Sequence, residues 1–180
     1  FDLIISNFFL NISESIEKIL SKISESLLPN GFFLGTLPSP DNFNSLKSAM
    51  IETDIKLYGG VYNRFNRTID LQIIIDILKK NNFKIPLVDS NQIHLEYNKF
   101  DKLLHDVRSM NLSYYQTDKK NTFEKKQYFN QLEFNYNKKE NDNFKLTSNF
   151  YLISGWKEHY SQQKPMQPGE AKNKLKDYLD

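Results

Sequence analysis

The chain has 180 residues, and its 39% hydrophobic and 14% aromatic content is typical of one folded domain rather than of a disordered segment. A net charge of +2 gives no electrostatic reason to expect a nucleic-acid partner. The absence of cysteine excludes disulfides and thiolate metal sites. No apolar run is long enough to span a membrane, and the uncharged start lacks the basic region of a signal peptide.

Lysine greatly outnumbers arginine, because Arg64, Arg67 and Arg108 are the only arginines among 24 basic residues. Together with the abundant asparagine, this bias is typical of an A/T-rich genome, and we expect a cytoplasmic, bacterial protein. The lysine pairs are expected to be solvated surfaces. A guanidinium makes planar, bidentate contacts that an ammonium cannot make, so each arginine is a candidate for a specific contact.

The first 37 residues are expected to form a strand, a helix and a second strand. Residues 1–6 are apolar and β-branched, as in a buried parallel strand. Asn11 and Glu14 have the spacing of a capping box for a helix with one apolar side. Residues 32–37 form the second apolar run. This order predicts a right-handed βαβ unit and a parallel sheet.

Helices and antiparallel strands are expected in the remainder. The helices are predicted to begin near residue 41, after a cap at Thr68, at residue 100 and near residue 122. The extended segments are predicted at residues 85–89 and 92–97, separated by a turn at 90–91, and at residues 144–156. Beyond residue 161 we expect an extended arm and a short terminal helix.

The segment Ser6-Asn7-Phe8 follows the first predicted strand. Open parallel sheets bind ligands at the carboxyl ends of their strands, which makes these three residues candidates for a ligand site. The alternative is a polar turn that only caps the next helix.

Tyr58 and Arg64 flank a glycine pair in an irregular segment. A guanidinium beside aromatic rings can bind a carboxylate or a phosphate, so both residues are candidates for substrate binding. The alternative is a loop arginine that is tethered to a nearby aspartate. The histidines lack metal-ligand spacing, and we expect no metal site.

The C-terminal segment has a distinctive order of residues. Gly155-Trp156 is followed by His159 and then by Ser161-Gln162-Gln163-Lys164-Pro165. This segment resembles the C-terminal signature of one branch of class I S-adenosylmethionine-dependent methyltransferase-like proteins. The branch includes relatives of the biotin-pathway malonyl-carrier-protein methyltransferase, and a complex I assembly factor of mitochondria that acts as an arginine hydroxylase; the signature favours the latter.

Other segments match that family in the same order along the chain. They are residues 1–7, 28–34, 58–65, 70–83, 88–97 and 104–110. The resemblance implies an α/β fold: the C-terminal half of a Rossmann-like class I methyltransferase fold, with parallel strands, an antiparallel tail and added helices. It also implies a domain over residues 1–160, followed by an arm and short helix over residues 161–180.

The resemblance implies S-adenosylmethionine as the cofactor, provided that the N-terminal half of the fold is supplied. It places Ser6, Asn7 and Phe8 at the cofactor, and Arg64, Tyr58 and His159 at the substrate. No catalytic base is assigned.

The family holds its cofactor on a Gly-rich turn, but this chain has six glycines and no such pattern. We therefore expect a truncated or split form that is inactive alone. Its expected partners are a separately encoded N-terminal half and, as substrate, a subunit of a respiratory complex. The alternative is a non-catalytic remnant or a partner-binding module.

Overall fold

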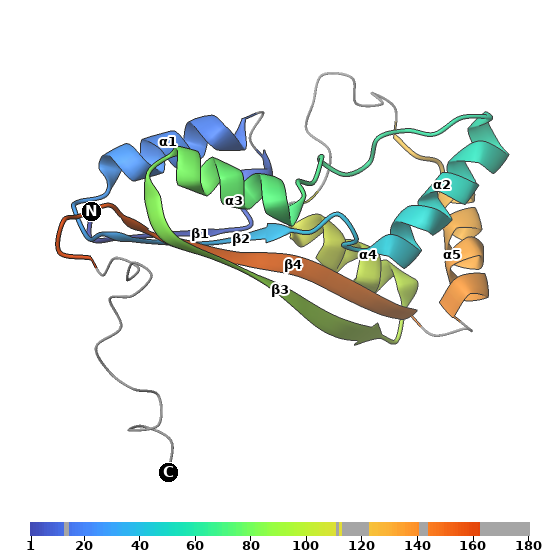
Figure 1. The fold of residues 1–180 in the computed structure, drawn as a ribbon. Helices are drawn as coiled ribbons and strands as arrows, with labels where there is room; N and C mark the ends of the chain where they lie inside the picture. The colour runs from blue at the N-terminus through green and yellow to red at the C-terminus, as the bar shows by residue number, and fades with distance from the viewer. Residues whose placement is uncertain (13–14, 111, 113–122, 141–143, 163–180) are drawn as a thin grey trace, which may run out of the picture.

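The computed structural model describes residues 1–12, 15–110, 112, 123–140 and 144–162, with the backbone alone at 138–140. The strands are β1 (Leu3–Asn7), β2 (Phe32–Pro38), β3 (Phe83–Tyr97) and β4 (Phe144–Lys157). The helices are η1 (Leu10–Ile12), α1 (Ile16–Ser26), α2 (Asn44–Tyr58), α3 (Leu71–Lys80), α4 (Phe100–Ser109) and α5 (Lys126–Glu140). Figure 1 shows their arrangement.

The strands form a 4-stranded sheet in the order β1-β2-β4-β3. β1 and β2 are parallel, whereas β4 runs antiparallel to both β2 and β3. Since parallel neighbours require a crossover, α1 connects β1 to β2 across one face of the sheet. The predicted α/β class, with a parallel start and an antiparallel tail, is confirmed.

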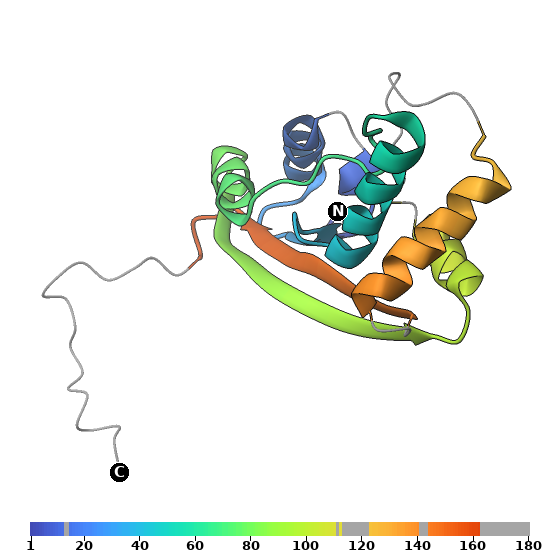
Figure 2. The ribbon, with the colours of Figure 1, turned by 90° about the vertical axis from the view of Figure 1, so that its right-hand side faces the viewer.

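A first hydrophobic core lies between the sheet and the helices α1 and α3, which cover the same face (Figures 1 and 2). Its buried members are Leu10, Ile16, Leu20, Leu27, Phe33, Leu37, Ile74, Leu78, Phe83, Tyr151 and Ile153. Both helices present an apolar stripe to the sheet, as their sequence periodicity predicts.

A second core lies at the other end of the long strands, among α2, α4 and α5 (Figure 2). Its buried members are Phe43, Leu46, Ala49, Phe100, Leu103, Leu104, Val107, Leu112, Tyr128, Leu132, Tyr136 and Leu146. β4 contributes Leu146 to this core and Ile153 to the first, so one strand connects the two.

The first strand differs from its expected burial. β1 pairs with β2 and has no other partner strand among the described residues. Leu3 is 51% exposed and Ile5 63% exposed. The prediction of a strand buried on both faces is therefore wrong for β1. Its apolar run forms an edge strand with one exposed apolar face among the described residues.

Two further local expectations are corrected. The helix α1 begins later than the proposed capping box, because the Ser15 hydroxyl accepts the Lys18 amide at 3.4 Å and serves as the N-cap. The two extended pieces around a turn at 90–91 are one continuous strand, β3. Ser90 and Asn91 pair with Tyr151 and Phe150 of β4, and this ladder keeps a polar dipeptide extended.

The remaining helix starts differ by a few residues: α2 begins at Asn44, and the N-cap of α3 is Asp70 instead of Thr68. The predicted terminal helix lies outside the described residues, as does most of the arm after residue 161. Among the helices that the structure describes, none has the length and apolarity needed to cross a membrane.

The difference in burial between two phenylalanines predicts how the stability changes when each side chain is shortened to alanine. Phe33 is 0% exposed and its ring lies 5.6 Å from that of Phe83, whereas Phe134 is 63% exposed. We expect Phe33→Ala to lower the free energy of unfolding by about 3–5 kcal/mol, and Phe134→Ala by less than about 0.5 kcal/mol. Urea unfolding followed by circular dichroism measures both. Equal effects would contradict the assignment of this core.

Candidate functional site

The turn after β1 lies at the carboxyl end of the parallel strands, as predicted for Ser6, Asn7 and Phe8. The Thr36 hydroxyl donates to Asn7 Oδ1 at 2.6 Å and accepts the Phe8 amide at 3.0 Å. Phe8 has a φ of 50°, and its ring packs edge-on against Phe150 at 5.8 Å. β2 therefore fixes the shape of this turn, while the side chain of Asn7 stays exposed.

Ser6 differs from its neighbours at this turn. It is 9% exposed, and its hydroxyl is buried without a hydrogen-bond partner among the described residues. A buried hydroxyl without a partner is unusual in a folded protein and commonly marks a bound water or ligand. Ser6 therefore fits the expected contact with a polar ligand.

A cavity of about 470 Å³ opens beside this turn, between the start of α1, the end of β2 and the segment that leads into α3. Its lining residues are Leu10, Asn11, Ile12, Ser15, Ile16, Glu17, Leu37, Pro38, Asn66, Arg67, Thr68, Ile69 and Ile77. Seven of the lining residues are apolar, and the six polar ones are Asn11, Ser15, Glu17, Asn66, Arg67 and Thr68. This size and composition suit a small ligand or one side chain of a larger substrate.

Asn11 is a polar residue of this cavity that the sequence analysis assigned to a helix cap. Both its side-chain oxygen and its side-chain nitrogen are buried without a hydrogen-bond partner among the described residues. An amide in this state can both donate to and accept from a ligand. Its spacing to Glu14 suggested a helix cap, and no sequence signal distinguished that role from a position in a cavity wall.

The loop after β2 is held firmly against β4. The Asn149 amide donates to Asn42 Oδ1 at 3.0 Å, and its side-chain nitrogen donates to Asp41 Oδ2 at 3.0 Å. Lys47 donates to the Pro40 carbonyl at 3.2 Å. Burial lowers the pKa of Lys47, although the Asp41 carboxylate opposes the shift. These hydrogen bonds fix the loop that leads from β2 into α2.

Arg64 lies away from the cavity, in an ion-pair network between α2 and α5. Its Nε donates to Asp54 Oδ2 at 3.1 Å, and its Nη2 donates to Glu124 Oε1 at 2.8 Å. Burial disfavours the charged guanidinium, but these two carboxylates outweigh that effect and raise the pKa of Arg64. Tyr58 donates its hydroxyl to Glu124 and so belongs to the same network.

The tether to an aspartate, which was the alternative for Arg64, is therefore present. A substrate role for Arg64 and Tyr58 stays a prediction, and any anionic ligand would have to compete with Asp54 and Glu124.

His159 lies at the opposite end of the sheet, because the residues that follow β4 pass the start of β2. Its Nδ1 is 3.0 Å from the Asn30 side-chain nitrogen and 2.8 Å from the Ser161 hydroxyl. The structure therefore separates His159 from both the β1 turn and Arg64. Its proposed contact with substrate stays a prediction, and its observed contacts join the C-terminal signature to the turn before β2.

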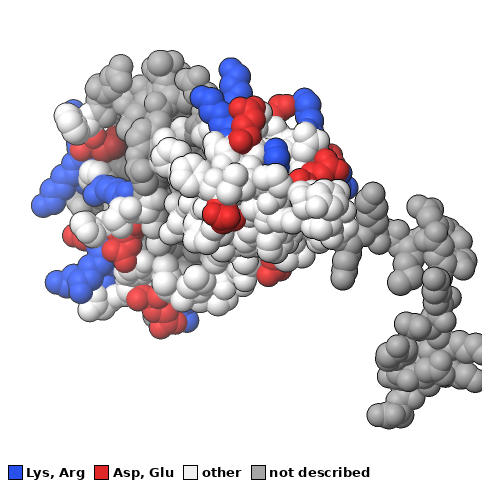
Figure 3. Space-filling view, turned by 90° about the vertical axis from the view of Figure 1, so that its left-hand side faces the viewer, with Lys and Arg blue, Asp and Glu red and all other residues white. Residues whose placement is uncertain are grey.

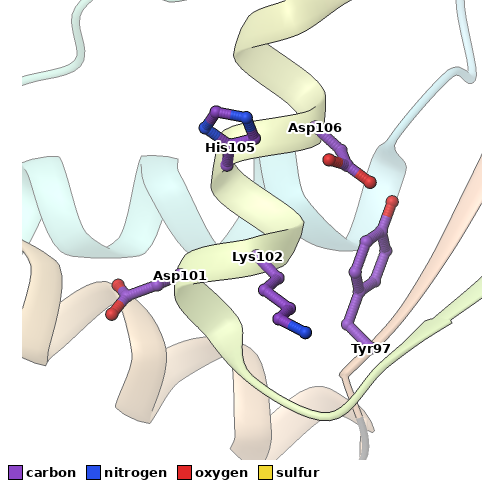
Figure 4. Close-up of a pocket in the computed structure, with 5 residues that line it drawn as sticks. All are labelled: Tyr97, Asp101, Lys102, His105 and Asp106. Carbon is purple, nitrogen blue, oxygen red and sulfur yellow. The ribbon is translucent and has the colours of Figure 1, made fainter.

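A second, shallower pocket of about 400 Å³ lies on the outer side of α4 (Figure 4). Tyr97 and Asp106 face each other there, whereas Asp101 points away from them. Burial and the Asp106 carboxylate raise the pKa of Tyr97 to about 12. The phenol therefore stays protonated at neutral pH and can donate a hydrogen bond, but it cannot act as a base.

Within the described ranges, no three histidine or carboxylate side chains are grouped so that they could hold a metal ion.

Sequence comparison identifies relatives that share one name, arginine-hydroxylase NDUFAF5, mitochondrial. The chain is 29% identical over 174 residues to the Dictyostelium discoideum protein, covering 95% of this chain and 40% of that protein. It is 22% identical over 173 residues to the human protein, covering 95% of this chain and 50% of that protein. The chain thus spans about half or less of the length of these relatives. No protein-family profile matches it.

Solved structures with the same fold include a candidate methyltransferase from Bacillus halodurans C-125, with a TM-score of 0.53 and 12% identity over 88% of this chain and 65% of that one. The YcgJ protein from Bacillus subtilis has a TM-score of 0.51 and 11% identity, and the match covers 88% of this chain and 64% of that one. At such identities the likeness concerns the fold alone. Together with the sequence relatives it supports the resemblance of the motifs to class I S-adenosylmethionine-dependent methyltransferase-like proteins.

Proposed function

We propose that this chain forms the substrate-side part of an S-adenosylmethionine-dependent enzyme related to the arginine-hydroxylase relatives. The observation that carries the proposal is the cavity beside the carboxyl ends of β1 and β2, in a fold shared with a candidate methyltransferase. Open α/β sheets bind their ligands at this edge.

The residues of the β1 turn fit part of a cofactor site. Ser6 offers a buried hydroxyl without a partner, and Asn7 offers an exposed amide that Thr36 holds in place. When bound, S-adenosylmethionine supplies an electrophilic methyl group. The chain has no Gly-rich turn for the cofactor's remaining contacts, so the proposal includes a second segment that carries this turn.

The cavity is proposed to hold the group to be modified. Its apolar residues contact that group, and Asn11 and Arg67 provide the polar contacts that orient it. A side chain of a respiratory-complex subunit is the proposed substrate, after the family resemblance. Methylation and hydroxylation would both require this positioning, and fold alone does not distinguish them.

The uncovered face of β1 supports the proposal of a second segment. Phe1 is 72% exposed and Phe9 is 60% exposed, in addition to the exposed Leu3 and Ile5. Figure 3 views the end of the molecule that carries the N-terminus, and a broad area there has few charged side chains. Parallel strands are normally buried on both faces and paired on both edges. We propose that the segment with the Gly-rich turn, on the same or a separate chain, covers β1.

The same surface also fits the alternative, a non-catalytic module that binds a partner. A cytoplasmic, bacterial setting belongs to our proposal as well, whereas the relatives are mitochondrial by name. Cofactor binding distinguishes the enzyme from the module.

The first test is cofactor binding by titration calorimetry. The chain is compared alone and co-expressed with the part of the Dictyostelium relative that lies outside the aligned 174 residues. We expect binding on the order of micromolar by the pair and none by the chain alone. Within the pair, Asn7→Ala should weaken binding about ten-fold, and the exposed Asn130→Ala should not. Binding by the chain alone, or none by a well-folded pair, would contradict the proposal.

The second test concerns the surface of β1. Ile5 on β1 is 63% exposed and Ile93 on β3 is 48% exposed, so an aspartate at either position should leave the fold of the chain intact. We expect Ile5→Asp to abolish assembly with the cofactor-binding part, because it places a charge in an apolar contact, and Ile93→Asp to leave assembly unchanged. Sedimentation velocity measures the fraction assembled. Normal assembly of the Ile5 variant would exclude β1 as the contact surface.

A further inference from the structure

The long strand β3 forms the edge of the sheet that lies farthest from β1. It pairs with β4, and no other strand among the described residues lies beside it. In Figures 1 and 2 it runs along the lower border of the sheet, below the described helices. The ladder has one irregularity between Lys84 and Leu87 and is regular from there to Tyr97. β3 is therefore a second edge of this sheet, distinct from β1.

The hydrogen bonds of β4 show how its backbone is oriented. The Thr147 carbonyl accepts the Phe43 amide at 3.2 Å, and the Asn149 carbonyl accepts the Ser39 amide at 3.1 Å. Both donors lie in the segment that follows β2, so these two carbonyls point away from β3. Successive residues of a strand direct their backbone groups to opposite neighbours. Ser148, which lies between the two, therefore directs its amide and carbonyl to β3.

The same alternation identifies the backbone groups of β3 that face away from β4. Ser148 is the partner of Ile93, so Ile93 bonds to β4 and the residues on either side of it face outward. Counting in steps of two along the regular ladder gives the outward-facing residues Val88, Ser90, Gln92, His94 and Glu96. A row of amides and carbonyls at the edge of a sheet is a template for the addition of another strand.

The apolar side chains of this edge are arranged symmetrically about Ser90. Leu87 lies three residues before it and Ile93 lies three residues after it. These side chains are 61% and 48% exposed, and they share one face of β3 because an even number of steps separates them. If an antiparallel copy of β3 is aligned with Ser90 opposite Ser90, Leu87 of each strand lies opposite Ile93 of the other. Two apolar cross-strand pairs would then be covered.

The polar residues between these positions also complement one another in this alignment. Asn91 donates its side-chain nitrogen to Asp89 Oδ2 at 3.2 Å within the strand. In the antiparallel pair, Asp89 of each strand lies opposite Asn91 of the other. Since an amide nitrogen has two hydrogens, each Asn91 can donate to both carboxylates. The centre of the pair therefore contains no carboxylate that lacks a donor.

The charges at the two ends of β3 favour the antiparallel orientation. Lys84 pairs with Glu158 at 2.9 Å near one end, and Glu96 pairs with Lys145 at 3.3 Å near the other. An antiparallel copy brings Lys84 towards Glu96 of the second strand, whereas a parallel copy would place like charges side by side. An antiparallel pair also has a two-fold axis and closes on itself, so it ends at two chains.

Pro86 sets a limit to the length of such a pair. It has no amide hydrogen and lies in the irregular part of the ladder, before Leu87. In the alignment about Ser90 it would lie opposite His94 of the second strand. The ladder between two copies is therefore expected to span residues 87–93 of each chain.

We propose that β3 pairs in antiparallel orientation with β3 of a second copy of this chain, about a two-fold axis at Ser90. The two sheets then form one continuous sheet. The second copy is the occupant because the apolar, polar and charged residues of this edge complement themselves in that single alignment. The inference goes beyond the proposed function, and β1 at the opposite edge stays available to the segment with the Gly-rich turn.

Disulfide trapping in the full chain tests the pair and its alignment. The chain has no cysteine, so Ser90→Cys introduces one thiol per copy at the two-fold axis. Opposite Cα atoms in such a pair are about 5.5 Å apart, which a disulfide can bridge. Gln92→Cys is the matched control, because position 92 is also exposed and lies on the same face. Its two thiols would be about 13 Å apart along the strands.

We expect oxidation with copper phenanthroline to cross-link Ser90→Cys about ten-fold faster than Gln92→Cys. Adding Ile93→Asp should abolish the cross-link, because it places a charge opposite Leu87 of the second copy. Adding Ile5→Asp, on the exposed face of β1, should leave the cross-link unchanged. Sedimentation velocity should show the wild type as a dimer. Equal rates for the two cysteine variants, or a monomeric wild type, would overturn the proposal.

Hydrogen exchange of the wild type provides a measurement that needs no substitution. The outward-facing amides of Ser90 and Gln92 should exchange more slowly as the protein concentration rises, because the second copy accepts their hydrogen bonds. The amide of Asn91 faces β4 and should exchange at a rate independent of concentration. Exchange at Ser90 that does not depend on concentration would refute the proposal. None of these measurements involves S-adenosylmethionine, so their outcome is independent of the cofactor test.

Discussion

The central constraint on this fold is the antiparallel pairing of β4 with both β2 and β3. β4 runs from Phe144 to Lys157; β3 pairs with it over nearly its whole length, and β2 pairs with it from Phe150 to Trp156. Its first part closes the core of α2, α4 and α5, and its last part closes the core below α1 and α3. Neither group of helices could bury its apolar face without this strand. The position of the cavity depends on the same pairing, because β4 fixes the loop after β2 through Asn149.

Much of the architecture was accessible from the sequence because its signals are local. The apolar periodicity of α1 and α3, the glycine that ends α2, and the apolar run of β4 each mark an element independently of distant contacts. The predictions were wrong where contacts between residues far apart in the sequence determine the local conformation. Ser90 and Asn91 have turn chemistry, but a long partner strand keeps them extended. Pro86 lacks an amide hydrogen and lies in the irregular part of the ladder, between Lys84 and Leu87.

The candidate site was predictable only in part, for the same reason. The position of Ser6, Asn7 and Phe8 at a strand end follows from the order of elements, and the structure places them in the turn after β1. Arg64, Tyr58 and His159 were grouped by family resemblance, but the fold separates His159 from the other two. The partners of Arg64 could not be read from local patterns, because Glu124 is 60 residues away in the chain. Asn11 had a stronger local interpretation as a helix cap.

The outward side of β1 has a further consequence for the life of this protein in a cell. Among the described residues β1 pairs on one side only, and an edge strand with exposed apolar side chains is a template on which other extended chains can add. Until that edge is covered, encounters with a cognate segment compete with self-association, and the latter grows with concentration. The yield of native protein would then depend on the relative rates of synthesis of this chain and of the segment that covers β1, as well as on thermodynamic stability.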